Sequence, residues 1–126
     1  MRPVLCAIVC AALHAAPARA QPVQPFPAAS PTDVLFAEGN LLGLLEYCHA
    51  QGFVTVAAID KQRETIQHVR GAERLSGMHE AAGREAGKQG IVAFWESRVP
   101  IAIAAQAQGI TVASRCKYTE LSLAMP

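Results

Sequence analysis

The feature that most constrains this fold is a single pair of cysteines. The chain has four cysteines, and two of them, Cys6 and Cys10, lie within the first 20 residues. The other two, Cys48 and Cys116, lie near opposite ends of the rest of the chain. We expect the first pair to be removed with an export signal, so that in an oxidising compartment the second pair forms one long-range disulfide. Two reduced, buried cysteines are the alternative.

The N-terminal region has the three parts of a secretory signal peptide. Arg2 gives a basic start, residues 4–13 (VLCAIVCAAL) form an apolar run, and residues 18–20 (ARA) place small residues where a signal peptidase cleaves. The pattern predicts cleavage after Ala20. The mature chain would then begin at Gln21 and lie in the periplasm or, alternatively, outside the cell.

Removal of the signal peptide changes the charge balance. The whole chain has 11 basic and 10 acidic residues, and the signal contains two of the basic ones. The mature chain is therefore slightly acidic and has no excess of basic residues to neutralise phosphates, so nucleic-acid binding is not expected. So short a chain can form only one modest core. A disulfide that closes a long loop would stabilise the folded state by about 4 kcal/mol in the chain-entropy model. The absence of a C-x-x-C pair argues against a redox role.

Proline, glycine and apolar periodicity divide the chain into segments. We expect a signal peptide at 1–20, a Pro-rich leader at 21–32, a helical domain at 33–118 and a flexible tail at 119–126. Apolar residues at helical spacing predict an all-α domain, a small bundle of about four helices joined by one disulfide. The first four predicted helices run from 33 to about 51, from 55 to about 70, from 77 to 90 and from 100 to about 108.

Polar residues and glycines predict the helix boundaries. Thr32 or Asp33 is expected to cap the first helix and Ser76 the third, because their side chains accept hydrogen bonds from free backbone amides. The glycines expected to end or separate helices are Gly52, Gly71, Gly90 and Gly109.

The last third of the chain has a weaker pattern. Residues 91–95 (IVAFW) are compatible with a helical turn or with a short strand, and Pro100 suits the first turn of a helix. Apolar and polar residues alternate over 110–117 regularly enough to be compatible with a strand. We interpret them as a final helix because most of the chain is helical by pattern.

Residues 40–48 (NLLGLLEYC), followed by Phe53 and Val54, resemble the N-x-x-G-x-L-x-Y-C signature of the YjjA-like family of small exported proteobacterial proteins. Members of that family resemble this chain in having a signal peptide, an Ala- and Leu-rich helical body and a second cysteine after a basic residue, as Cys116 follows Arg115. The resemblance implies export, a helical fold and a disulfide. It implies no activity.

We interpret the residues of this signature as structural. Gly43 lies where a neighbouring helix can approach closely, and Asn40 is expected to hydrogen-bond to a neighbouring backbone. Leu45 and Cys48 lie about one turn apart on the apolar stripe of the first helix. The ring of Tyr47 is expected to pack while its hydroxyl reaches water.

Other chemistry has less support in the sequence. His49, His68 and His79 could serve with sulfur donors in an exported copper or zinc carrier, but they are spread over three predicted helices without H-x-x-x-H spacing. Serines in settings such as G-x-S-x-G are absent, so we expect neither an enzyme nor a cofactor. Gly83 and Gly87 form a G-x-x-x-G pair, but charged residues lie within it, and close packing within a monomer or between copies is the simpler interpretation.

These patterns predict an exported, non-enzymatic helical protein of the periplasm that binds other envelope proteins or itself, for example in envelope stress. We expect no nucleic-acid partner and no transmembrane helix in the mature chain. A carrier of copper, zinc or a small ligand is one alternative, and a membrane-active glycine-rich protein is another.

Overall fold

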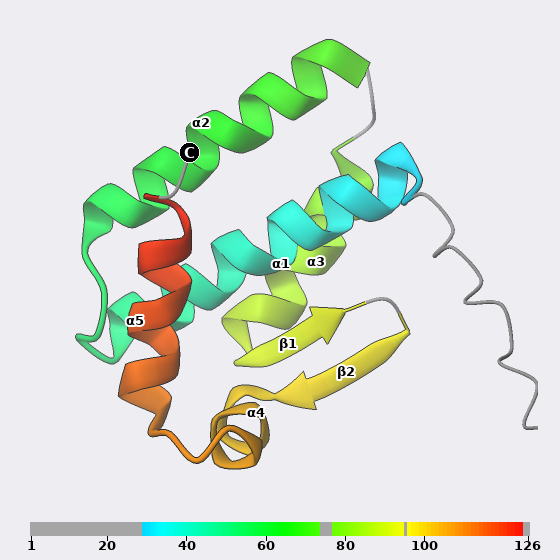
Figure 1. The fold of residues 1–126 in the computed structure, drawn as a ribbon. Helices are drawn as coiled ribbons and strands as arrows, with labels where there is room; N and C mark the ends of the chain where they lie inside the picture. Colours follow the sequence, from blue (N-terminus) through cyan, green and yellow to red (C-terminus); the bar gives the residue numbers. More distant parts are fainter. Residues whose placement is uncertain (1–28, 74–76, 95, 125–126) are drawn as a thin grey trace, which may run out of the picture.

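A computed structural model describes residues 29–73, 77–94 and 96–124 (Figure 1). The elements of this part of the chain are α1 (Pro31–Ala50), α2 (Val56–Glu73), α3 (Met78–Lys88), β1 (Ile91–Phe94), β2 (Ser97–Pro100), α4 (Ile101–Ala107) and α5 (Val112–Ser122). None of these helices is long and apolar enough to cross a membrane. The predicted signal peptide, most of the predicted leader and Ser76 lie outside the described residues.

Helices dominate the described residues, as predicted, and the departure from an all-helical fold is a short hairpin. β1 and β2 pair antiparallel, from Ile91 opposite Pro100 to Phe94 opposite Ser97. Of the two alternatives for the apolar run at 91–95, the strand is therefore correct for 91–94. Pro100 ends β2 and is the N-cap residue of α4, so its predicted place in the first helical turn is wrong.

Helix α1 begins slightly earlier than predicted. The Ser30 hydroxyl accepts a hydrogen bond from the Asp33 backbone N–H, and Asp33 Oδ2 accepts one from the Ser30 backbone N–H, both at 3.2 Å. This is a capping box, and Pro31 suits the first helical turn that follows it. The prediction of Thr32 or Asp33 as the cap is therefore wrong. At the other end, Gly52 has a φ of 76°, the left-handed conformation expected of a residue that ends a helix.

Two predicted boundaries are wrong because a helix continues past them. Gly71 lies inside α2, since one glycine lowers helix stability by about 1 kcal/mol without preventing the helix. Helix α5 continues to Ser122, beyond the predicted end of the domain at 118. Its last turns are held to the start of α2, because the Glu120 carboxylate accepts hydrogen bonds from the Thr55 backbone N–H at 3.0 Å and from the Thr55 hydroxyl at 2.7 Å.

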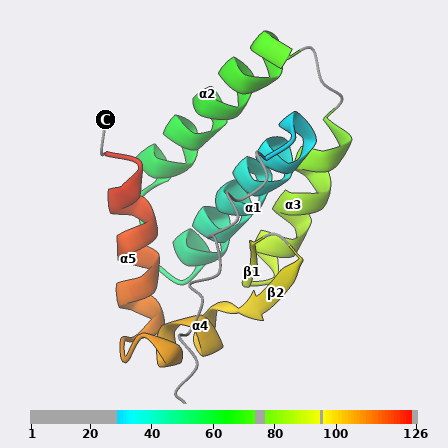
Figure 2. The ribbon, with the colours of Figure 1, turned by 45° about the vertical axis from the view of Figure 1, so that its right-hand side comes forward.

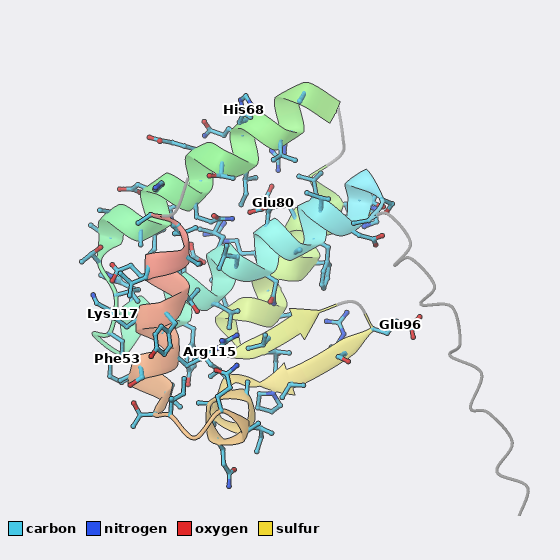
Figure 3. The ribbon with its side chains drawn as sticks, viewed as in Figure 1. Phe53, His68, Glu80, Glu96, Arg115 and Lys117 are labelled. Carbon is cyan, nitrogen blue, oxygen red and sulfur yellow. A yellow bond between two sulfur atoms is a disulfide. The ribbon has the colours of Figure 1, made fainter. Side chains whose placement is uncertain are left out.

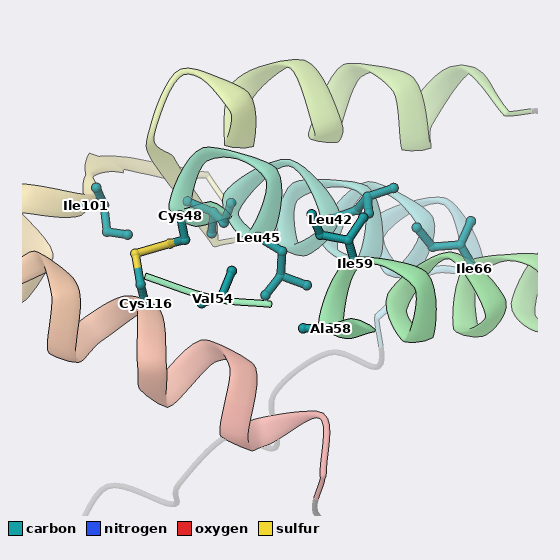
Figure 4. Packing of buried hydrophobic residues seen from close by; sticks show 10 residues of the cluster. Leu42, Leu45, Cys48, Val54, Ala58, Ile59, Ile66, Ile101 and Cys116 are labelled. Carbon is teal, nitrogen blue, oxygen red and sulfur yellow. A yellow bond between two sulfur atoms is a disulfide. The ribbon is translucent and has the colours of Figure 1, made fainter. Parts of the chain in front are cut away.

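Helix α1 lies at the centre of the fold. In both ribbon views it runs between α2 and α3, and α5 crosses near its C-terminal end (Figures 1 and 2). The apolar core gathers around the C-terminal half of α1 (Figure 4). Its buried members are Leu42, Leu44, Leu45, Cys48, Val54, Ala58, Ile59, Ile66, Ile101 and Cys116. The core therefore joins α1 to α2, α4 and α5.

Candidate functional site

Cys48 on α1 and Cys116 on α5 form the predicted disulfide. Both residues are fully buried, and their Cα atoms lie 5.7 Å apart (Figure 4). The bond links positions that are 68 residues apart in the sequence. With both sulfurs bonded to each other inside the core, the pair is a covalent part of that core.

Asn40 is a buried polar residue that joins three elements. Its Nδ2 donates hydrogen bonds to the backbone oxygens of Gly83 at 3.2 Å and Ile91 at 2.9 Å, and its Oδ1 accepts one from the Ala93 N–H at 2.9 Å. The two bonds to β1 reach the edge that faces away from β2, so the amide pairs strand groups that burial would otherwise leave unsatisfied. Asn40 thus has the backbone partners expected of it, and it holds α3 and the hairpin against α1.

Gly43 is one of four glycines at which α1 and α3 touch backbone to backbone. A Cβ added to Gly43 would lie 2.1 Å from the backbone oxygen of Arg84. Equivalent additions at Gly39, Gly83 and Gly87 would lie 2.0 to 2.3 Å from backbone oxygens of the opposite helix. The close approach expected at Gly43 is present, and the G-x-x-x-G pair of α3 packs within the monomer.

Leu45 and Tyr47 also have packing roles. Leu45 is fully buried in the core, and Tyr47 is partly buried and packs against the core cluster. The Tyr47 ring also covers Gly90, where an added Cβ would lie 3.0 Å from the ring. The four non-cysteine residues of the signature therefore all serve the architecture around α1.

The histidines of the metal-carrier alternative lie on three different helices. His49 is near the C-terminal end of α1, where its Nδ1 lies 3.0 Å from the backbone oxygen of Val54. His68 is exposed on α2 and points away from the bundle (Figure 3), and His79 lies in the first turn of α3. In the described part of the chain, His, Cys, Asp and Glu side chains form no group of three or more that could hold a metal ion.

Glu46 carries a charged contact between three helices. Its carboxylate accepts hydrogen bonds from Arg84 at 2.9 and 2.5 Å and lies 3.3 Å from Nη2 of Arg63. Partial burial alone would raise the pKa of Glu46, but the hydrogen bonds and charges of these basic neighbours outweigh burial and lower it. Arg70 and Glu80 form a second ion pair, between α2 and α3. The charges in this region are therefore compensated.

A groove between the N-terminal half of α1 and the tip of the hairpin is the candidate binding site. Its volume is about 480 Å³. Its lining residues are Ala29, Asp33, Val34, Phe36, Ala37, Glu38, Ala93 and Glu96. Five of these eight residues are apolar and the other three are acidic. Glu96 lies at the tip of the hairpin, on the side of the molecule where α1 begins (Figure 3).

The acidic residues of the groove have no ion-pair partner among residues 29–73, 77–94 and 96–124. Asp33 accepts hydrogen bonds from the side chain and backbone of Ser30, which lower the pKa of Asp33. Glu38 accepts a hydrogen bond at 2.5 Å from Nε2 of Gln62, a fully buried residue of α2. Hydrogen bonds from neutral groups leave the charge of both carboxylates in place. The groove therefore combines an apolar lining with three carboxylates that no ion pair within the described residues neutralises.

Sequence reasoning missed this groove because its two walls are distant in the sequence. The hydrogen bonds of Asn40 to β1 bring the walls together, and no local pattern reports such a contact. One signal was available. Asp33, Glu38 and Glu96 have no Lys or Arg three or four positions away, whereas most other acidic residues of the chain do.

Comparisons with known proteins find no match. No protein-family model matches the chain, and neither a curated protein nor a solved structure does so. The resemblance of residues 40–48 to the YjjA-like family stays a prediction. A functional proposal therefore rests on the groove and its surroundings.

Proposed function

We propose that this protein is an exported, non-enzymatic helical protein that binds a partner protein of the bacterial envelope. The observation that carries the proposal is the groove of about 480 Å³ with its apolar lining and acidic residues. Apolar contacts beside polar or charged ones are typical of surfaces that recognise other proteins.

Both walls of the groove are held in place before a partner arrives. The α1 wall belongs to a helix that contacts α3 through glycine backbones, and the hairpin wall is bonded to Asn40. A preformed surface loses less conformational entropy when it binds than a surface that must first become ordered. This rigidity supports binding as the use of the groove.

Two observations support export. The N-terminal residues have the pattern of a secretory signal peptide, and the Cys48–Cys116 disulfide is of the kind that persists in oxidising compartments such as the periplasm. A protein collected from the periplasm should begin at Gln21 and should have the mass of the oxidised form. Protein with free thiols or with an uncleaved N terminus would contradict export.

Site-specific photo-crosslinking tests the binding function. A photoreactive residue at Ala37, which is exposed in the groove, should capture a defined partner protein in intact cells. The matched control carries the same residue at Gln67, an exposed position on α2 outside the groove. We expect a partner band from position 37 and none from position 67. Equal capture from both positions, or capture from neither, would contradict the groove as a binding site.

A further inference from the structure

We infer that the groove recognises a basic and apolar peptide segment, in which an apolar side chain is flanked by Lys or Arg. This inference rests on the proposed function and names the chemistry of the partner. It depends on the distribution of ion pairs, on the size of the lining residues and on the position of Glu38.

Ion pairs neutralise four acidic residues outside the groove. Glu46, Asp60, Glu80 and Glu120 each lie within 3.3 Å of a Lys or Arg nitrogen. Asp33, Glu38 and Glu96 have no such partner in the described part of the chain and line one groove. Glu64 and Glu85 also have no ion pair there, but each is exposed on a helix outside the groove. An arriving cation would therefore meet carboxylates that form no ion pair within residues 29–73, 77–94 and 96–124.

The acidic residues lie on both walls of the groove. Asp33 and Glu38 belong to α1, whereas Glu96 lies at the hairpin tip. Two basic side chains of the described residues lie near the groove. Arg98 lies over the Phe36 ring, 5.3 Å from its centre, and His79 is near enough to Asp33 to help lower the pKa of Asp33. A peptide whose basic residues flank an apolar one can reach both walls, which a single compact cation cannot do.

Small residues leave room for the apolar side chain of the guest. Ala37 and Ala93 line the groove from opposite walls, and Val34 and Phe36 supply larger apolar surfaces beside them. The hollow of about 480 Å³ is large enough for several side chains of a peptide.

Glu38 is the most restrained of the acidic residues. The buried Gln62 donates from Nε2 to the Glu38 backbone oxygen at 3.1 Å and to Glu38 Oε2 at 2.5 Å. These two bonds fix the side chain against α2, and Glu38 is one of the residues that line the groove. A fixed carboxylate loses less side-chain entropy on pairing with a guest cation than a freely rotating one. We therefore expect Glu38 to contribute more to binding than Glu96, which is exposed at the tip.

Fluorescence anisotropy with labelled peptides tests the inference on the folded, oxidised protein, residues 21–126. Four peptides of equal length would carry Lys-Leu-Lys, Gln-Leu-Gln, Glu-Leu-Glu or Lys-Gly-Lys at their centre. We expect the Lys-Leu-Lys peptide to bind most tightly and to weaken as salt is added, because exposed charge pairs are screened. An exposed ion pair contributes about 0.2–1 kcal/mol, so Glu38→Gln and Glu96→Gln should each weaken binding by up to about five-fold.

Glu64→Gln is the matched control, since Glu64 is an exposed acid on α2 outside the groove. It should leave the affinity unchanged. Equal affinity for the Lys-Leu-Lys and Gln-Leu-Gln peptides, or equal effects of Glu38→Gln and Glu64→Gln, would overturn the inference while the groove still binds. Failure of all four peptides would also overturn it. Capture of a partner from Ala37 in the crosslinking experiment would, in that case, leave the proposed function standing.

Discussion

Replacement of Gly43 by alanine tests whether α1 and α3 are held together by backbone contact. An added Cβ would lie 2.1 Å from Arg84 O and 2.8 Å from Lys88 N, whereas ordinary contact begins at 3.4 Å. Both atoms belong to the backbone of α3, so no side-chain rotation relieves the clash. The two helices have to separate locally by about 1.3 Å.

The expected loss of stability follows from three contributions. Overpacking of a tight contact costs about 1–3 kcal/mol. Separation of α1 from α3 also lengthens the buried hydrogen bond from Asn40 to Gly83, which is 3.2 Å in the native fold, at a cost of about 1–3 kcal/mol if the groups are left unpaired. Alanine has a better helix propensity than glycine, which offsets about 1 kcal/mol. We therefore expect Gly43→Ala to lower the free energy of unfolding by about 3 kcal/mol.

Gly71→Ala is the matched control, because Gly71 also lies inside a helix but an added Cβ would meet nothing within 4 Å. This variant should raise the free energy of unfolding by up to about 1 kcal/mol, through helix propensity and a less flexible unfolded chain. Urea unfolding of both variants, followed by circular dichroism with the disulfide intact, measures the two changes. The backbone contact is not what holds α3 if the free energy of unfolding of Gly43→Ala lies within about 0.5 kcal/mol of the wild-type value. The same conclusion follows if both substitutions change the free energy of unfolding in the same direction.

Three further perturbations address other parts of the fold. Replacing Cys48 and Cys116 by alanine should lower the free energy of unfolding by about 4 kcal/mol, because the bond closes a loop across 68 positions; a loss under about 1 kcal/mol in urea would contradict this. Asn40→Ala should cost about 2–4 kcal/mol in the same assay, since it leaves three backbone groups of α3 and β1 without their partner; a variant as stable as the wild type would show that water replaces the amide. Hydrogen bonds from Lys117 and Thr55 lower the pKa of Glu120 to about 2, so its contribution to stability is present above the unfolded pKa near 4.3 and is lost as the pH falls toward 2. The difference in melting temperature between the wild type and Glu120→Gln should therefore shrink between about pH 4.5 and pH 2, and a constant difference would disprove the assigned pKa.

Glycine positions were informative in the sequence, but their conformations were only partly predictable. Gly52, Gly90 and Gly109 follow helices and have φ values of 76°, 71° and 67°, as their predicted places require. Gly71 looks similar in the sequence and lies within α2. After Gly52, the buried Val54 turns back into the core and supports a helix end, whereas Ala72 after Gly71 is exposed. Whether a glycine ends a helix therefore depends on tertiary contacts of the residues that follow it.

The hairpin and the groove could not be predicted because their contacts are not local. The turn between β1 and β2 lacks the Asn-Gly or Asp-Gly pairs that signal a hairpin, and two strands of four residues are only marginally stable alone. The free edge of β1 is paired by Asn40, which is 51 residues before Ile91 and 53 before Ala93. The sequence predicted that Asn40 has a backbone partner and left open which backbone it is. The position of the hairpin wall depends on which backbone groups Asn40 binds.

The disulfide and the contacts of Asn40 and Gly43 both hold α1, but they lie at different distances from the groove. Ten residues of helix, about 15 Å, separate Glu38 from Cys48, so the disulfide lies well away from the groove. Asn40 and Gly43, in contrast, position the α3 helix and the hairpin that carries Glu96. Protein that is reduced but still folded should therefore bind the Lys-Leu-Lys peptide as tightly as the oxidised form. The folded fraction of Asn40→Ala should bind it more weakly, because its hairpin wall is no longer fixed. If the reduced protein and Asn40→Ala lost equal affinity for the peptide, overall stability and not the placement of the hairpin would determine binding in the groove.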